Sequence, residues 1–256
     1  MKGDRSVTER DLATRIAAVP NWYHRIELAP GVVTPGINDT ARNLQILNDL
    51  GLPPDCKGAR VLDLGARDGF YTFEMERRGA EVVAVDYASR EATGYDLVAE
   101  VFRSQARYIR ANVYDLRVAD LGTFDIVLCL GLLYHLRDPL LALDTLRPLC
   151  SHLFYLETQI IDAGVLMNDG TFPALNALSP ALVDVPLMQY FPRDVLSHDI
   201  TNHWAPNMTC MRALLSDADF ASHGDWQEGN RGVFAATVGA DDAARYKRQI
   251  ARGLLG

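Results

Sequence analysis

Short apolar runs alternate with helix-forming segments along the middle of the chain. The runs are rich in valine and leucine, which is typical of strands buried on both faces of a parallel sheet. We expect these strands at Val61–Leu64, Glu81–Asp86, around Tyr108 and Ile109, at Thr123–Leu130 and at Leu153–Leu156. The alternation of strands and helices predicts an α/β fold with a mostly parallel sheet.

Helical spacing of apolar residues predicts the helices between and around these strands. Three boundaries carry a local signal: Gly79 stops the helix at Phe70–Arg78, Asp138 caps a helix with Pro139 at its first position, and Asp39 or Thr40 caps another. The expected helices are Asp4–Val19, Thr40–Leu50, Phe70–Arg78, Ala88–Arg103, Pro139 to before Pro148, Pro206–Asp217 and Asp241–Leu254.

The alternation stops at residues 160–202, which contain four prolines and no helix of convincing length. Such an insertion in a regular fold is typical of a lid or of a wall around a substrate. After it, Phe220–Trp226 and Gly232–Val238 predict a closing antiparallel hairpin. We therefore divide the chain into an N-terminal helical cap at 1–57 and a ligand-binding domain at 58–256, with a lid at about 160–202.

The segment Arg60–Asp86 predicts a strand, a glycine turn, a helix and a second parallel strand. In such a βαβ unit the ligand lies at the carboxyl ends of the strands. Glycines at 65 and 69 let the backbone approach that ligand, but the third glycine of the dinucleotide fingerprint is missing. Asp68 stands in the turn instead, where it would repel a pyrophosphate and suit a ligand with a cationic or amino end. A nicotinamide dehydrogenase is therefore disfavoured.

An acid, a G-x-x-x-G turn and a second acid about 20 residues later together resemble the class I S-adenosylmethionine (SAM) methyltransferases. The resemblance implies a Rossmann-like fold with a seven-stranded, mostly parallel sheet and an antiparallel C-terminal hairpin. It also implies SAM as the cofactor and S-adenosylhomocysteine (SAH) as its product. The cofactor-binding residues implied are Asp63, Gly65, Ala66, Gly69, Asp86, Tyr87, Asn112, Val113 and Leu130.

Each implied group has a part of SAM as its partner. Asp63 would orient the turn or reach the ammonium group, and Asp86 would take the ribose hydroxyls unless it is merely a solvated acid at a strand end. Asn112 replaces the family's usual acid at the adenine amino group, with Val113 beside the ring.

A closer resemblance rests on WYHRIELAPGVVTPG, GLLYHLRDP, YLET and NHWAPNMTCMRALLSDADF, which span most of residues 20–238 outside the insertion. These motifs are similar to those of the bacterial tRNA wobble-uridine carboxymethyltransferases and of related small-molecule and natural-product methyltransferases. The tRNA enzymes have a longer basic N-terminal region and a cationic grip on a carboxylated SAM. This chain shows no lysine in the matching region, so we expect ordinary SAM and a small acceptor.

Aromatic and polar residues from three separate segments are candidates for the acceptor pocket. They are Trp22, Tyr23, Tyr134, Glu157 and Trp204. The alternative for the two tryptophans is that they only pack the N-terminal cap onto the sheet.

Three histidines are candidates for catalysis, because a hydroxyl acceptor needs a general base. His135 is the first choice, followed by His24 and His203. The alternative for His135 is a packing histidine bonded to the first turn of the next helix. His24, His135, Glu157 and His203 lack the spacing of metal ligands, so no metal is expected.

Composition and charge narrow the class of protein further. The 256 residues are 48% hydrophobic and carry a formal net charge of −8, which opposes a polyanionic nucleic acid partner. Four scattered cysteines predict buried, reduced thiols. Without a signal peptide or an apolar run of membrane length, we expect a cytoplasmic protein that does not bind a membrane. The oligomeric state stays open.

The sequence therefore predicts a SAM-dependent methyltransferase that carries out O- or N-methylation of a small molecule, in specialised or natural-product metabolism. One alternative is a tRNA-modifying enzyme of the wobble-uridine type, which predicts a basic stripe around the pocket. The other is a non-catalytic SAM-binding protein that has kept the fold.

Overall fold

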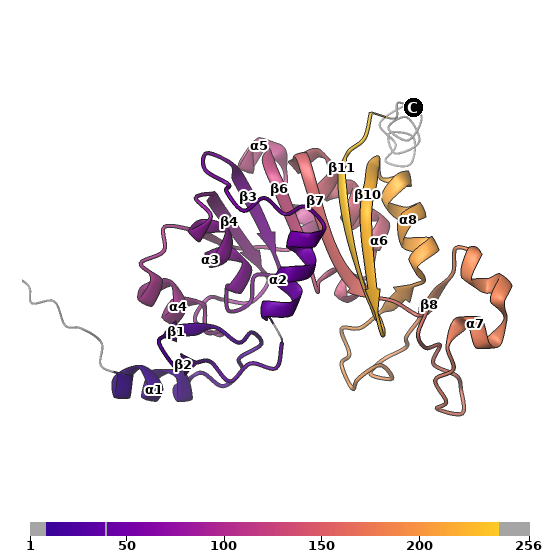
Figure 1. The fold of residues 1–256 in the computed structure, drawn as a ribbon, viewed down its shortest axis with the longest axis horizontal. Coiled ribbons are helices and arrows are strands. Elements are labelled where there is room, and N and C mark those ends of the chain that lie inside the picture. Colours follow the sequence, from indigo (N-terminus) through magenta and orange to yellow (C-terminus); the bar gives the residue numbers. More distant parts are fainter. Residues whose placement is uncertain (1–8, 39, 241–256) are drawn as a thin grey trace, which may run out of the picture. The chain divides into compact units, whose positions relative to one another are not determined.

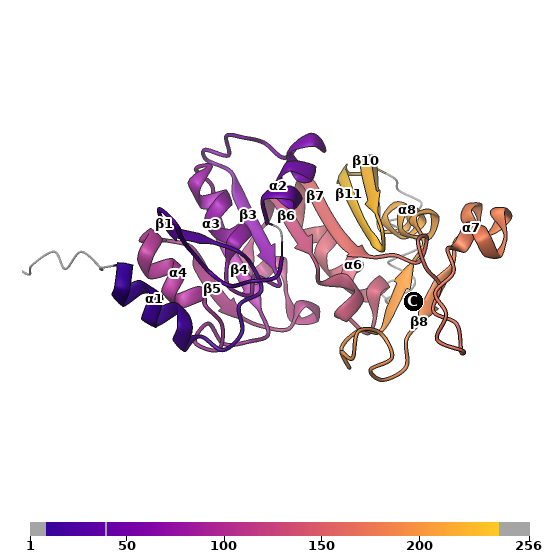
Figure 2. The same ribbon diagram turned by 60° about the horizontal axis from the view of Figure 1, so that its bottom comes forward.

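The structure is a computed structural model that describes residues 9–38 and 40–240 (Figures 1 and 2). Asp39, the start of the first predicted helix and the helix predicted at Asp241–Leu254 lie outside the described residues. Two compact units make up the chain. The N-terminal unit comprises residues 1–45 and 53–112, and the C-terminal unit comprises residues 46–52 and 113–256. The domain boundary predicted at residue 57 stays a prediction.

Seven strands form one mixed sheet in the order β10-β11-β7-β6-β3-β4-β5. The N-terminal unit contributes the parallel strands β3 (Arg60–Leu64), β4 (Glu81–Asp86) and β5 (Arg107–Arg110). The C-terminal unit contributes β6 (Phe124–Leu130), β7 (Cys150–Gln159), β10 (Phe220–Glu228) and β11 (Arg231–Val238). Strands β6 and β7 are parallel, whereas β11 is antiparallel to both β7 and β10. The predicted α/β fold, with its antiparallel C-terminal hairpin, is confirmed.

In the N-terminal unit, α1 (Glu9–Ala18) and the hairpin of β1 (Glu27–Ala29) and β2 (Val32–Val33) lie beside α4 (Tyr95–Phe102) in both ribbon views (Figures 1 and 2). Their apolar side chains form one cluster with α3 (Phe70–Arg77). Trp22 belongs to this cluster, and its indole N–H donates to the carbonyl of Ile16 at 3.0 Å. The position of Trp22 therefore agrees with the packing alternative, and its role in binding an acceptor stays a prediction.

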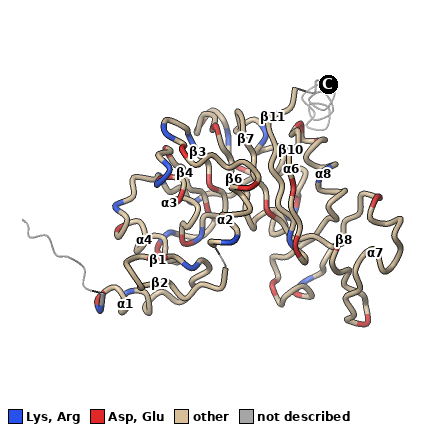
Figure 3. Tube along the Cα trace, viewed as in Figure 1, with Lys and Arg blue, Asp and Glu red and all other residues tan. Residues whose placement is uncertain are grey.

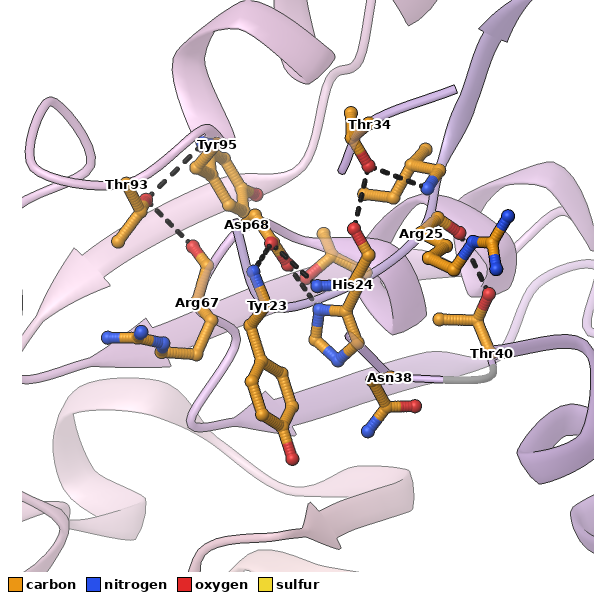
Figure 4. A network of polar contacts seen from close by, with 12 residues as sticks. Tyr23, His24, Arg25, Thr34, Asn38, Thr40, Arg67, Asp68, Thr93 and Tyr95 are labelled. Atoms are coloured by element: carbon orange, nitrogen blue, oxygen red, sulfur yellow. Dashed lines mark hydrogen bonds and ion pairs between the residues drawn. The ribbon is translucent and has the colours of Figure 1, made fainter. Parts of the chain in front are cut away.

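Local signals set the ends of α3 and α4. Gly79 follows α3 with φ +94°, so the predicted stop of that helix is confirmed. The helix predicted at Ala88–Arg103 is wrong in its first half, because α4 begins only at Tyr95. The Thr93 hydroxyl donates to the carbonyl of Arg67 at 2.9 Å, which holds the preceding segment in turns (Figure 4). A Cβ on Gly94 would lie 2.1 Å from the Trp22 ring, so only glycine fits there.

Helix α2 (Thr40–Asp49) confirms the helix predicted at Thr40–Leu50. Its residues are divided between the two units after Gln45. The C-terminal unit continues with η1 (Val113–Asp115), α5 (Val118–Leu121), η2 (Leu133–His135), α6 (Pro139–Leu146), η3 (Arg147–Leu149) and α8 (Met208–Asp217). Pro139 opens α6 as predicted, but the Asp138 side chain makes no capping hydrogen bond. The cap of α8 is Asn207, whose side chain accepts from the Cys210 N–H at 2.8 Å.

The insertion contains only the short helices α7 (Leu175–Leu178) and η4 (Pro180–Asp184) and the strand β8 (Met188–Tyr190), as its prolines predicted. Strand β8 pairs antiparallel with β9 (Trp204–Pro206). Asn207 fastens the insertion to α8, since its amide accepts from the Leu187 N–H at 3.1 Å and donates to the Val185 carbonyl at 2.8 Å. One side chain thus satisfies a helix end and the backbone of the insertion.

Two further predictions concern the described residues. The four cysteines are free thiols with buried side chains, as predicted. Across residues 9–38 and 40–240, no helix has both the length and the apolar character needed to cross a membrane.

The substitution Asn207→Ala should lower the free energy of unfolding by about 1–3 kcal/mol, because it removes a helix cap and leaves buried backbone groups without partners. Urea denaturation of the purified variant measures this loss. The control is Asn168→Ala, an exposed residue of the same insertion. Equal midpoints for the two variants would contradict the role of Asn207.

Candidate functional site

The turn between β3 and α3 brings backbone to the carboxyl end of a buried strand. Gly65 and Gly69 adopt φ values of +73° and +88°, in the left-handed region where glycine is favoured. A Cβ on Gly69 would also lie 2.3 Å from the Phe73 ring. The Gly65 N–H donates to the carbonyl of Val85 at 2.8 Å, and Ala66 is buried within the turn. The glycines at 65 and 69 are therefore required by the backbone of the turn itself.

Asp86 ends β4 with a buried carboxylate that the backbone orients. One oxygen accepts from the Arg67 N–H at 2.9 Å, and the other accepts from the Ala88 N–H at 2.9 Å. Each carboxylate oxygen has two lone pairs, so both oxygens retain acceptor capacity for a pair of vicinal hydroxyls. Tyr87 follows with a side chain that is 71% exposed, and Asn112, just after β5, is exposed as well.

Asp63 lies within β3 and points at the first helix after the turn. Its carboxylate accepts from the Thr72 hydroxyl at 2.5 Å. Burial raises the pKa of Asp63 to about 6, although the hydrogen bond from Thr72 acts in the opposite direction. This contact fits the first of the two predicted roles of Asp63, the orientation of the turn.

The sequence suggested that the carboxylate of Asp68 faces a ligand. In the structure it contacts groups of the chain itself. It is 1% exposed, and it accepts from the backbone N–H groups of Tyr23 at 2.8 Å and His24 at 2.9 Å. Its second oxygen contacts Nδ1 of the His24 ring (Figure 4). Burial opposes ionisation, but these hydrogen bonds prevail and lower the pKa of Asp68. The acid therefore binds the chain's own N-terminal segment, which brings Tyr23 and His24 to the glycine turn.

In the C-terminal unit, the ends of β6, β7 and β11 gather polar side chains. Glu157 lies 3.1 Å from the Arg231 guanidinium, and burial raises the pKa of this glutamate in spite of that cation. Arg231 also donates to Tyr134 Oη at 3.3 Å and lies 5.1 Å from the centre of its ring. The Glu157 carboxylate would lie only 3.5 Å from a Cβ on Gly131, whose φ is +69°.

The other predicted residues of this unit contact the insertion and the loop after β6 or lie within short elements. Nδ1 of the His135 ring lies 2.8 Å from the Thr201 hydroxyl, so this contact is with the insertion instead of the first turn of α6. The backbone N–H of His203 donates to the carbonyl of Tyr134 at 3.0 Å. Trp204 is buried and donates its indole N–H to the carbonyl of Leu136 at 2.7 Å, a contact that does not involve the N-terminal cap. Val113 is buried in η1, and Leu130 ends β6.

Sequence reasoning missed Thr72, Arg231 and the true partner of Asp68. The contact of Arg231 with Glu157 depends on the pairing of β11 with β7, where Arg231 faces Gln159 in the register. No local pattern carries that register. For Asp68, the motif beginning with Trp22 was a signal, but nothing in it named the acid that its histidine contacts. Within the described ranges, no three His, Cys, Asp or Glu side chains are arranged to hold a metal ion.

Comparisons with known proteins identify the class. The sequence pattern of the methyltransferase domain family matches residues 38–202, which is more than half of the chain. The ubiquinone biosynthesis O-methyltransferase of Xanthomonas oryzae pv. oryzae is 38% identical over 85 residues, which cover 33% of this chain and 36% of that enzyme. The chain thus matches only about a third of the curated relative's length.

Two solved structures share the fold. The N-terminal domain of EvdMO1 with SAH bound has a TM-score of 0.60 and 22% identity, over 94% of this chain and 100% of that domain. The 1,6-didemethyltoxoflavin-N1-methyltransferase of Burkholderia thailandensis, with that substrate and SAH bound, has a TM-score of 0.52 and 17% identity, over 78% of this chain and 77% of that enzyme.

The protein belongs to the methyltransferase domain family. The predicted enzyme class is confirmed, and SAH in both solved structures agrees with SAM as the methyl donor. The roles of the individual site residues stay predictions.

The raised pKa of Asp63 makes stability depend on pH. An acid with a pKa of 3.8 when unfolded and about 6 when folded binds more protons in the folded state between those values. The free energy of unfolding therefore falls as pH rises through this window, by about 3 kcal/mol in total. Asp63→Asn should abolish this loss, so the variant should exceed the wild type in stability at pH 7 and match it more closely at pH 4.

Urea denaturation at pH 4, 5, 6 and 7 measures the difference between the two proteins. The control is Asp96→Asn on α4, whose side chain is 42% exposed in an ion pair with Arg90. If the difference between Asp63→Asn and the wild type stays constant with pH, the buried-charge assignment is wrong.

Proposed function

We propose that the protein is a SAM-dependent methyltransferase that methylates a hydroxyl group of a small molecule. The observation that carries this proposal is the carboxylate of Asp86, which the Arg67 and Ala88 N–H groups hold at the end of β4. A fixed acid beside a glycine turn suits the ribose of an adenosyl group. The family match supplies the reaction class.

The residues of the N-terminal unit fit SAM in chemistry. Backbone at Gly65–Gly69 would face the methionine end, Asp86 would bind the ribose hydroxyls, and Asn112 would accept from the adenine amino group. Tyr87 would offer apolar surface to the adenine and the ribose. When bound, SAM supplies a methyl group on a sulfonium, which is already a strong electrophile. The protein's own contribution is then to position the acceptor, exclude water and take up a proton.

A small acceptor is supported by the relatives and by charge. One relative is named as an O-methyltransferase of ubiquinone biosynthesis, one solved neighbour binds 1,6-didemethyltoxoflavin, and another was crystallised in the presence of D-fucose. The net charge of −8 opposes the RNA alternative, and basic positions are interspersed with acidic ones along the described trace (Figure 3). A place in specialised metabolism would follow from such an acceptor.

Titration calorimetry with SAM, SAH and NAD⁺ tests the donor. We expect the two adenosyl compounds to bind and NAD⁺ not to bind. Asp86→Asn should weaken SAM binding roughly tenfold to a hundredfold, because a charged hydrogen bond is worth about 1.5–3 kcal/mol. The control is Glu81→Gln, an exposed acid at the opposite end of the same strand.

SAM affinity that is unchanged in Asp86→Asn would remove the ribose assignment, and a wild type that binds NAD⁺ would remove the donor. The acceptor class is tested by SAH formation with catechol, D-fucose and aniline. Methylation of the two hydroxyl compounds supports the proposal, and methylation of aniline alone contradicts the choice of oxygen.

A further inference from the structure

Both carboxylate oxygens of Asp68 are used by the segment that follows Trp22. Oδ2 accepts from the backbone N–H groups of Tyr23 and His24, at 2.8 and 2.9 Å. Oδ1 contacts Nδ1 of the His24 imidazole. His24 and Asp68 lie 44 positions apart in the sequence, so tertiary structure alone brings this pair together.

This contact selects one tautomer of His24. A carboxylate whose pKa is lowered can only accept hydrogen bonds, so the proton of the contact belongs to His24 Nδ1. In the neutral ring, Nε2 then carries a lone pair. Figure 4 shows this second nitrogen pointing away from Asp68. An imidazole held in this way is a hydrogen-bond acceptor of fixed direction.

Aromatic rings shield His24 from most contact with water. Its side chain is 5% exposed, and its ring lies 4.8, 5.8 and 5.6 Å from the ring centres of Tyr23, Phe70 and Tyr71. Phe70 and Tyr71 open α3 directly after Gly69. His24 therefore stands at the end of the turn that we propose for the methionine moiety of SAM. The ionisable groups that face it are Asp68, Asp63, Tyr23 and Tyr71.

The backbone of His24 is fixed as firmly as its ring. Its carbonyl accepts from the Thr34 hydroxyl at 2.6 Å, and the same hydroxyl accepts from the Ile26 N–H at 2.8 Å. A Cβ on Gly36 would lie 2.2 Å from that carbonyl oxygen, so position 36 must be glycine. Fixed contacts of both the ring and the backbone are typical of a preorganised functional group.

His135 and His203 make contacts of a different kind. His135 Nδ1 meets the hydroxyl of Thr201, which can donate or accept and so leaves the tautomer open. The described hydrogen bonds of His203 run through its backbone N–H and carbonyl. For His24, in contrast, the carboxylate of Asp68 dictates which ring nitrogen is basic.

We propose that His24 is the general base of methyl transfer to a hydroxyl acceptor and that Asp68 is its positioning residue. The proposal rests on the function proposed above. His24 Nε2 takes the hydroxyl proton while the acceptor oxygen uses its electron pair to form the new bond to the methyl carbon. The electron pair of the broken carbon–sulfur bond stays on sulfur, so SAH leaves as a neutral thioether. Asp68 stays ionised beside the imidazolium, which passes its proton to solvent.

Nitrogen NMR of protein labelled with ¹⁵N-histidine, in the presence of SAH, tests the tautomer without turnover. His24→Gln assigns the His24 signals by their loss. We expect neutral His24 with its proton on Nδ1 in the wild type, and a shift toward the other tautomer in Asp68→Asn. Asp96→Asn removes a partly exposed carboxylate of the same unit, paired with Arg90, and should leave the His24 tautomer unchanged. A wild-type proton on Nε2 would overturn the proposal.

Kinetics with catechol or D-fucose, whichever the wild type methylates, test the base. His24→Gln and Asp68→Asn should each lower kcat by about 10²–10⁴-fold. Their SAM affinity should stay within about threefold of the wild type. The double variant should be no slower than His24→Gln, because the two residues act as a unit. The control for the loss of a histidine is His223→Gln, an exposed residue on β10.

The outcomes separate this inference from the proposed function. A wild type that binds no SAM refutes the proposed function, whatever the tautomer. A wild type that binds SAM and methylates a hydroxyl, with kcat in His24→Gln within threefold of normal, overturns the role of His24 alone. Methylation of aniline only also overturns it and leaves SAM binding intact. If Asp68→Asn fails to fold, the wild-type tautomer and His24→Gln still decide.

Discussion

The N-terminal unit depends on one buried carboxylate. Asp68 accepts two backbone N–H groups and contacts an imidazole, all from a segment that precedes the first strand of the parallel sheet. A buried carboxylate without these partners would cost several kcal/mol, so the turn and the segment can be buried only together. That joint burial places Trp22 on Gly94 and His24 beside the start of α3. The N-terminal segment is thereby part of the wall of the candidate site.

Three buried acids close to one turn are accommodated in three ways. Asp68 stays charged because donors surround it, and Asp86 has a backbone donor on each oxygen. Asp63 has one hydroxyl donor, and burial raises its pKa to about 6. A site that keeps a costly acid gives up stability, which is commonly the case where a group is retained for binding. The pKa of Asp68 is thus lowered and that of Asp63 raised, because Asp68 receives more hydrogen bonds from the chain than Asp63 does.

The C-terminal unit follows a different rule. Its polar side chains meet because parallel strands end at one edge and an antiparallel strand begins there, so that Arg231 of β11 reaches Glu157 of β7. The insertion is fastened through Asn207, which serves the end of α8 and the backbone of residues 185 and 187 at once. Long-range register and a single amide therefore define the polar cluster of this unit.

Sequence patterns by themselves predicted the strands, the glycine turn, the acid at the end of β4 and the closing hairpin, since these depend on residues that are near one another in the chain. The seven-stranded sheet was implied by the family resemblance, and the structure decided the order of its strands. The sequence patterns overestimated the helix at Ala88–Arg103, where the hydroxyl of Thr93 and the ring of Trp22 favour turns. They also gave Asp68 to a ligand and missed Arg231. Both errors concern side chains whose partners lie 44 or more positions away, and only the tertiary structure decided which groups are buried together. Burial makes such pairing obligatory, but the local pattern does not record the partner.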